Sequence, residues 1–478
     1  MSKRPKQSPT EQPLPFTYDD EVAEEGVTAL GGIPVLVQAF RSFGVGSSVK
    51  RNIVLKQRQR GLPEDGYVES FVILNAAGGD CIEDFEQLRA DESLAELIGH
   101  EFPSAEAARK FLYQFHDEAK VEEARQAALG LDQRSYVPGE NAALAGLGAV
   151  NRDMVQEFGR RTQDKIATID MDATIIESWK REAQPTYEGS TGYQPMLALW
   201  AELNVVVADQ FRDGNVGAHT QLLPVAQQAF AALPDCVQER YFRGDSACYE
   251  QELMRWLRDR NRAEGPQGFI GFGISAKMSE SLRERLRMLP EGLWKPYRED
   301  GEAEWEYAEL QNWDPLEKAG EQLDHIRYLA LRVHRRQGEL FGDGKLYKYY
   351  AVVTNRWDFD AKKWLEWQRE KAGTIEAAHD VLKNELAAGV MPCGRFGANA
   401  AWLRLAVLSY NLLSALKRLA LPPELLSARP KRLRFLIFNT AGRVLHHARR
   451  ILCRLRHMGD RFGGWRAVLA ALPLPHPA

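Results

Sequence analysis

The spacing of apolar residues predicts helices over the first third of the chain. Residues from about 20 to 150 read as mostly helical, and Ser104 is placed to cap a helix because its hydroxyl can accept from the N–H groups of the first turn. The stretch from Asp91 to Gly99 reads as a shorter helix that ends at a glycine. Two helices joined by a short turn are compatible with helix-turn-helix binding to DNA, although most such pairs only pack together.

A run of strand-like segments begins near residue 165. Five segments carry the apolar runs and turn residues typical of strands, and two carry helical spacing. The strands are expected at 165–176, 196–200, 204–211, 238–243 and 269–274, and the helices at 220–232 and 249–259. The order β-β-β-α-β-α-β is the ribonuclease-H-like topology. We therefore predict an α/β chain built on a ribonuclease-H-like mixed sheet.

The remaining segments are expected to surround this sheet. A proline-free stretch at 361–386 reads as one helix, and a long apolar helix is expected at about 400–421. The expected domains are a disordered tail at 1–17, a helical DNA-binding or dimerisation domain at 18–150, a catalytic domain in two parts at 160–278 and 348–390, an inserted β-rich domain at 279–347, and a basic helical region at 391–478.

Composition limits the class of protein. The 478 residues are 44% hydrophobic and 27% charged, which is ordinary for a globular chain of two or three domains. No segment suits a signal peptide or a membrane span, and no glycine-rich loop is followed by G-K-[ST], so neither a membrane nor a nucleotide is an expected partner. The five cysteines lack C-x-x-C spacing, which argues against a disulfide framework or zinc site and favours a cytoplasmic protein.

Positive charge gathers near the C-terminus, although the net charge is only −4. Between Lys417 and Arg456 there are eleven Lys or Arg residues and one acid, Glu424. Such a run can bind phosphates, because a polyanion releases its counterions when the basic groups neutralise it. A solvated helical face explains the same pattern equally well.

Three carboxylates are the candidate catalytic groups. Asp170 and Asp172 share one face of the first strand, and Asp245 follows the fourth strand. Because the carboxyl ends of neighbouring strands gather ligands, Asp172 and Asp245 are expected to be neighbours, with Glu376 reaching them from a helix. Carboxylate oxygens suit Mg²⁺, and two such ions can promote phosphodiester chemistry. Asp170 remains an alternative to Asp172.

The predicted helix at 361–386 adds candidate cations. Arg369 lies seven residues before Glu376 and Lys383 seven after it, which places all three on one helical face. A metal-binding carboxylate and phosphate-binding cations could then share one groove. An ordinary charged surface helix has the same spacing.

The motifs around these acids closely resemble those of DDE transposases of bacterial insertion sequences, and the nearest group is that of insertion sequence thirteen-eighty. The resemblance spans about residues 20 to 460. Asp172-Ala173-Thr174 matches the first-acid pattern D-x-T, and Gly244-Asp245-Ser246 matches the second-acid corner. Glu376 with Lys383 matches the E-(6)-K half of the signature Y-(2)-R-(3)-E-(6)-K.

The signature's other half is absent here, since Ala372 stands where its Arg is expected and the nearest cations are Lys371 and Arg369. The resemblance implies Asp172, Asp245 and Glu376 as ligands of two Mg²⁺ ions, with Mn²⁺ as a substitute. The DNA-contacting residues are expected to be Lys383, Arg369, Lys371 and Arg395.

The implied activity is DNA transposition. The enzyme would bind the terminal inverted repeats of its element on double-stranded DNA, cut the ends and join them to target DNA. It would work as a homodimer in a paired-end complex in the bacterial cytoplasm, at the nucleoid when bound to DNA. The alternatives are a ribonuclease-H-like nuclease or resolvase without strand transfer, and a DNA-binding derivative that has lost catalysis.

Aromatic residues of the insertion form a further candidate group. They could stack on an unpaired base of the DNA end, or they could be core residues. The group comprises Trp294, Tyr297, Trp305, Tyr307 and Trp313.

Overall fold

The computed structural model describes most of the chain. The described residues are 26–55, 61–299, 303–315, 322–335, 341, 346–448, 450–455 and 464–474. The tail expected at 1–17 lies outside them. Among the helices in these ranges, none has the length and hydropathy needed to cross a membrane.

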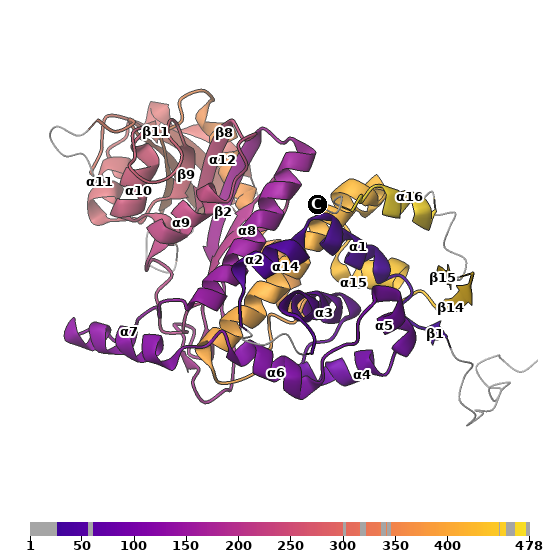
Figure 1. The fold of residues 1–478 in the computed structure, drawn as a ribbon. Helices are drawn as coiled ribbons and strands as arrows, with labels where there is room; N and C mark the ends of the chain where they lie inside the picture. The colour runs from indigo at the N-terminus through magenta and orange to yellow at the C-terminus, as the bar shows by residue number, and fades with distance from the viewer. Residues whose placement is uncertain are drawn as a thin grey trace, which may run out of the picture.

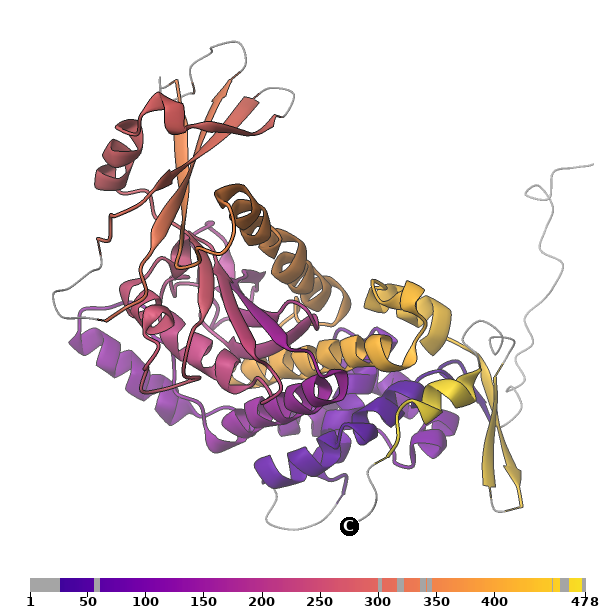
Figure 2. The ribbon, with the colours of Figure 1, turned by 90° about the horizontal axis from the view of Figure 1, so that it is seen from above.

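A nine-stranded mixed sheet forms the centre of the α/β part, in the order β10-β11-β12-β13-β9-β8-β2-β6-β7 (Figures 1 and 2). The strands that lie side by side come from distant parts of the chain. Their bounds are β2 (Ile166–Ala173), β6 (Met196–Trp200), β7 (Val205–Gln210), β8 (Glu239–Gly244), β9 (Gly271–Ser275), β10 (Lys295–Glu299), β11 (Ala303–Leu310), β12 (Arg327–Arg335) and β13 (Lys348–Thr354).

The ribonuclease-H-like prediction is confirmed by the pairing within this sheet. β2, β6 and β7 form an antiparallel meander, while β8 and β9 run parallel to β2. The connecting helices are α9 (Leu222–Ala231) and α10 (Gln251–Arg258). Ala167, Ile169 and Met171 of β2 are fully buried, as the central strand of a sheet covered by helices requires.

The segment expected as an insertion extends this same sheet. It contributes α11 (Glu280–Arg287), the short helix η4 (Glu291–Leu293) and the strands β10, β11 and β12. These strands pair in sequence onto β13, and β13 pairs with β9. The edge of the catalytic sheet therefore continues into the insertion without a gap.

The prediction of one helix over 361–386 is wrong. Two helices occupy the segment, α12 (Ala361–Arg369) and α13 (Lys371–Glu385), and they are drawn in brown beside the sheet in Figure 2.

The break at Glu370 follows from a competing hydrogen bond. The Trp367 carbonyl oxygen accepts from Arg243 Nη1 at 2.7 Å, and the turns at this point are three residues long: Glu370 N donates to Trp367 O, and Gly373 N to Glu370 O. A guanidinium at that carbonyl changes the regular helical ladder. Arg243 lies 124 residues away in the chain, so local sequence carries no sign of it.

The helical part of the chain packs beside the sheet, on the opposite side from the insertion (Figure 1). The predicted caps are confirmed: Ser104 Oγ accepts from Ala107 N at 3.2 Å, and Gly99 ends its helix in the left-handed region at φ +81°. The helices are α1 (Pro34–Ser42), α2 (Val45–Asn52), α3 (Glu64–Ala77), α4 (Phe85–Arg89), α5 (Glu92–Ile98), α6 (Ala105–Tyr113), α7 (Glu118–Gly130) and α8 (Ala142–Thr162), with the short η2 (Ile82–Asp84).

The long apolar helix α14 (Phe396–Ala420) joins the helical part to the sheet. Every residue from Gly397 to Leu416 is buried, and α14 packs on α3, α6, α8 and β7. Asn411 reinforces this contact, since its side chain accepts from Val206 N and donates to Val206 O, both at 2.8 Å.

The C-terminal region is only partly helical. After α14 come the short helices η5 (Pro423–Leu425), α15 (Pro430–Leu433), η6 (Arg434–Phe438) and α16 (Trp465–Ala470). A three-stranded sheet β1-β14-β15 is formed by β1 (Val27–Thr28), β14 (Gly442–His447) and β15 (Arg450–Leu455). Another small sheet, β3-β5-β4, is formed by β3 (Ile176–Glu177), β4 (Gln184–Pro185) and β5 (Thr191–Tyr193).

Candidate active site

Asp172 lies at the carboxyl end of β2, where the strand emerges from the core. Its Oδ1 accepts from Ala173 N at 3.1 Å, and its Oδ2 lies 3.3 Å from Lys371 Nζ of α13. Burial raises the pKa of the Asp172 carboxyl, the Lys371 charge opposes that rise, and the Asp245 charge adds to it. A half-buried carboxylate thus sits between a cation and a second acid.

Asp245 reaches the same place from the neighbouring strand. β2 and β8 run parallel with Met171 opposite Gly244, so the residues that follow these two positions emerge side by side. Asp245 then caps the short helix η3 (Ser246–Cys248) by accepting from Ala247 N at 3.0 Å. The parallel pairing explains why the charge of Asp245 raises the pKa of Asp172, although the two residues are far apart in the chain.

Gly244 is required at this corner for steric reasons. A Cβ atom on Gly244 would lie 2.5 Å from Cys248 Cβ and 2.7 Å from Cys248 Sγ, much closer than van der Waals contact allows. The absence of a side chain lets η3 turn back against the strand end, and this turn positions Asp245.

Glu376 is carried on α13 between two lysines that reach the end of β2. Lys371 contacts Asp172, and Lys383 Nζ donates to the carbonyl oxygen of Ile175 at 3.2 Å. Glu376 itself is exposed to solvent. The ligand oxygens of the three acids do not all lie within 4.8 Å of one another. Asp172 and Asp245 are close enough for the charge of Asp245 to raise the pKa of Asp172, and Glu376 lies on the adjoining helix.

The donor set fits a divalent cation. The two strand-end acids offer hard carboxylate oxygens, and the raised pKa of Asp172 shows that negative charge is crowded and poorly solvated here. Lys371 already places one positive charge against this carboxylate.

Asp170, the alternative first acid, has a structural role. It is fully buried and forms a two-pronged ion pair with Arg243, at 2.6 Å to Nε and 2.9 Å to Nη2. The Thr374 hydroxyl also donates to Asp170 Oδ2. Because both carboxylate oxygens are engaged inside the protein, Asp170 fastens α13 to the sheet and Asp172 is the acid that faces the site.

A family model described as transposase DDE domain group 1 matches residues 22–461. The chain belongs to this transposase family. The resemblance to DDE transposases is thereby confirmed, while the narrower group and a bacterial origin stay predictions.

Among solved structures, the transposase is similar to one described as the cryo-EM structure of a piggyBac transposase synaptic complex with hairpin DNA. The TM-score is 0.45 at 12% sequence identity, over 82% of this chain and 77% of that chain. A comparison with curated protein sequences gave no match.

The four predicted DNA-contacting cations of the transposase are distributed over three places. Lys371 and Lys383 lie along α13 at the end of β2, as described above. Arg369 lies before the helix break and packs its guanidinium over the rings of Tyr297 and Trp305, with centroid distances of 5.2 and 5.6 Å. Arg395 stands at the start of α14, over the Tyr113 ring at 4.0 Å.

The aromatic group of the insertion is packed into the protein. Trp294 and Tyr297 are each 7% exposed. Trp305 stacks on Tyr350 at a centroid distance of 5.8 Å, and Trp313 packs against Tyr328 at 4.9 Å. These contacts favour a role of these residues in the packing of the insertion over stacking on a DNA base.

One residue near the acids was missed at the level of sequence. Tyr187, in the turn between β4 and β5, is 77% exposed, and its pKa is raised by burial, by Glu188 and by the charges of Asp172 and Asp245. The strands β4 and β5 are two and three residues long, too short for a recognisable pattern.

His379 lies on the buried face of α13. It is buried, and its Nε2 has no hydrogen-bond partner among the described residues. Burial lowers the pKa of this imidazole to about 3, and the charges of Lys371 and Lys383 add to the effect.

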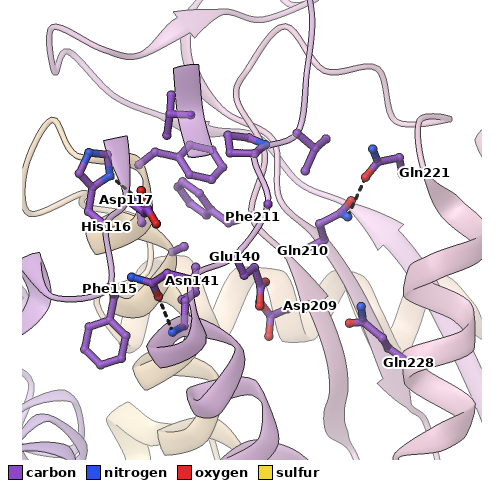
Figure 3. Close-up of a pocket in the computed structure, with 18 residues that line it drawn as sticks. Phe115, His116, Asp117, Glu140, Asn141, Asp209, Gln210, Phe211, Gln221 and Gln228 are labelled. Atoms are coloured by element: carbon purple, nitrogen blue, oxygen red, sulfur yellow. Dashed lines mark hydrogen bonds between the residues drawn. The ribbon is translucent and has the colours of Figure 1, made fainter. Parts of the chain in front are cut away.

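A separate cavity of about 310 Å³ lies where the helical part meets the sheet and α14 (Figure 3). Two of its acidic residues, Glu140 and Asp209, are both bound by Arg404, at 2.6 and 2.9 Å. Neither Asp172 nor Asp245 lines this cavity. The charged groups here hold elements together, since Arg404 belongs to α14 and Asp209 to β7.

Proposed function

We propose that this protein is a DNA transposase whose metal-binding acids are Asp172, Asp245 and Glu376. The observation that carries the proposal is the emergence of Asp172 and Asp245 from the ends of adjacent parallel strands, in a chain that matches a DDE transposase family over most of its length. Ligands gather at such strand ends in open α/β sheets.

The proposed cofactor is a pair of Mg²⁺ ions, with Mn²⁺ as a substitute, held by the three acids. When bound, the ions would activate the attacking oxygen and stabilise the leaving one. The chain's own residues would prepare this step. Asp245 is fixed by its cap on η3, and Asp172 is held by Ala173 N and by Lys371.

The lysines of α13 provide the proposed grip on the DNA backbone. Lys371 and Lys383 flank Glu376 and lie against the end of β2, so a scissile phosphate brought to the acids would meet two ammonium groups. A phosphate would partly take over the role of Asp172 as the partner of Lys371. Arg369 and Arg395 are proposed contacts to DNA farther from the reacting phosphate.

The proposed substrate is double-stranded DNA that ends in the terminal inverted repeats of the element, together with target DNA. The helical part at 18–150 is proposed to bind DNA or to dimerise. A homodimer that pairs two ends, acting in the bacterial cytoplasm and at the nucleoid, completes the proposal.

Cleavage and strand transfer on a labelled duplex carrying the element's end, with Mg²⁺, test the proposal. Wild type should give both nicked and joined products, and Asp172→Ala, Asp245→Ala and Glu376→Ala should give neither. Glu284→Ala is the matched control, because Glu284 is an exposed acid on a different helix, α11. Cleavage without joining would favour a nuclease or resolvase, and activity in all three variants would overturn the assignment of the site.

A further inference from the structure

The structure sorts the basic run at the C-terminus into two groups. The first group is engaged inside the protein. Lys417 is largely buried and donates to the Ala428 carbonyl at 3.2 Å, and Arg429 pairs with Asp380 at 2.6 Å and with Glu385 at 2.5 Å. Arg434 is also engaged, with its guanidinium donating to backbone carbonyls of α3 and α13. These residues hold the C-terminal region in place.

The second group lies on the hairpin of β14 and β15. The two strands pair along their full length, from Gly442 opposite Leu455 to His447 opposite Arg450. In Figure 2 the hairpin is the gold ribbon that stands apart from the helices. Six residues per strand give a ribbon about 20 Å long.

The two faces of this hairpin differ in character. Because side chains alternate along a strand, Val444 shares the inner face with Thr28 of β1, and both are buried. The outer face is mostly exposed and carries three arginines, one histidine and three apolar residues, with no carboxylate among them. Its residues are Val27, Arg443, Leu445, His447, Arg450, Leu452 and Arg454.

The arrangement of charge on the outer face favours an anionic partner. Arg450 and Arg454 are both exposed on this face, and Leu452 lies between them. Arg450 and Arg454 are separated by about 13 Å along their strand, close to the roughly 12 Å width of the DNA major groove.

We propose that the outer face of the β14–β15 hairpin is a DNA-binding site, distinct from the acids, that lies against the major groove of a duplex. Arg450 and Arg454 bind phosphates on the two sides of the groove, and the apolar side chain of Leu452 between them faces the base edges. Two-stranded ribbons fit this groove, and arginine suits phosphate through paired hydrogen bonds. The inference rests on the proposed function, since it supplies a second hold on the same DNA.

The test is the affinity of the full-length protein for a labelled 40-base-pair duplex of arbitrary sequence, measured by fluorescence anisotropy at several salt concentrations. The double variant Arg450→Ala/Arg454→Ala should bind about tenfold more weakly, and the slope of log affinity against log salt should decrease by about 2. Arg450→Lys/Arg454→Lys should retain most of the slope, because the charges remain.

The matched control is Arg283→Ala/Arg287→Ala on α11. These two arginines are also four residues apart and are both 41% exposed. Their loss should leave affinity and slope near wild type. Equal losses of affinity in the two double variants would overturn the hairpin site. So would an unchanged affinity of the hairpin variant at an unchanged melting temperature, and the outer face would then be available to a partner other than DNA. A wild type that binds no duplex at low salt would overturn the transposase proposal as well.

Discussion

Lys371 Nζ lies 3.3 Å from Asp172 Oδ2, and both side chains are largely withdrawn from solvent. This ion pair ties the first residue of α13 to the end of β2. If Asp172 holds a metal ion as proposed, Lys371 and that ion would compete for the same carboxylate.

Removal of this competing charge should tighten metal binding. Lys371→Met is expected to lower the Kd for Mn²⁺ in the absence of DNA by about tenfold, equivalent to about 1.4 kcal/mol. Isothermal titration calorimetry measures this directly. Lys363→Met, an exposed lysine of α12, is the control and should leave the Kd unchanged. Weaker Mn²⁺ binding in Lys371→Met would contradict the competition.

Asp170 and Asp172 should respond to the same substitution to different degrees. Asp170→Asn leaves the buried Arg243 guanidinium with only the exposed Glu370 as a charged partner and is expected to cost about 3–5 kcal/mol of the free energy of unfolding. Asp172→Asn should cost clearly less, because burial raises the pKa of Asp172 and so offsets part of what its ion pair with Lys371 contributes. Urea denaturation compares the two. Equal destabilisation would mean that Asp172 is structural as well.

Substitution of Gly244 tests whether the corner before Asp245 requires a residue without a side chain. Gly244→Ala would drive a methyl group into Cys248 and is expected to cost about 1–3 kcal/mol of stability while displacing Asp245. The melting temperature and the rate of DNA cleavage should both decrease. Gly292→Ala is the control, because nothing lies within 4 Å of a Cβ at that position. A stable and active Gly244→Ala variant would show that η3 does not position Asp245 as described.

His379 should make stability depend on pH. Its pKa is lowered from 6.5 to about 3 in the folded state, so between these values the unfolded chain binds a proton that the native protein does not. Stability should therefore fall as pH falls from about 6.5, by about 2 kcal/mol at pH 5. His379→Leu should reduce this dependence, and His447→Gln, an exposed histidine, should not. Denaturation curves at pH 7 and pH 5 measure the difference, and identical pH dependence in wild type and His379→Leu would refute the assignment.

Local sequence predicted the parts of the fold that local patterns determine. The strand at Met196–Trp200 has the predicted bounds, and the cap at Ser104 is as expected, because apolar runs and capping hydroxyls act over a few residues. The neighbourhood of Asp172 and Asp245 was also predictable, since the β-β-β-α-β order makes β2 and β8 adjacent and parallel.

Long-range contacts determined the parts that sequence missed. The break at Glu370 depends on Arg243, and the structural role of Asp170 depends on that same guanidinium, which no local pattern reveals. The β14–β15 hairpin was not predicted, because the basic residues of this segment are also typical of a solvated helical face. Its two faces became visible only through the pairing register.

Asp172 is proposed to hold a metal ion that promotes cleavage of the DNA. A thiolate is a poor ligand for Mg²⁺ and a better one for Mn²⁺ and Cd²⁺. Asp172→Cys should therefore fail to cleave the element's end in Mg²⁺ and should recover cleavage when Mn²⁺ or Cd²⁺ is added, whereas Asp170→Cys should recover nothing. Cleavage by Asp172→Cys at the wild-type rate in Mg²⁺ would contradict the account.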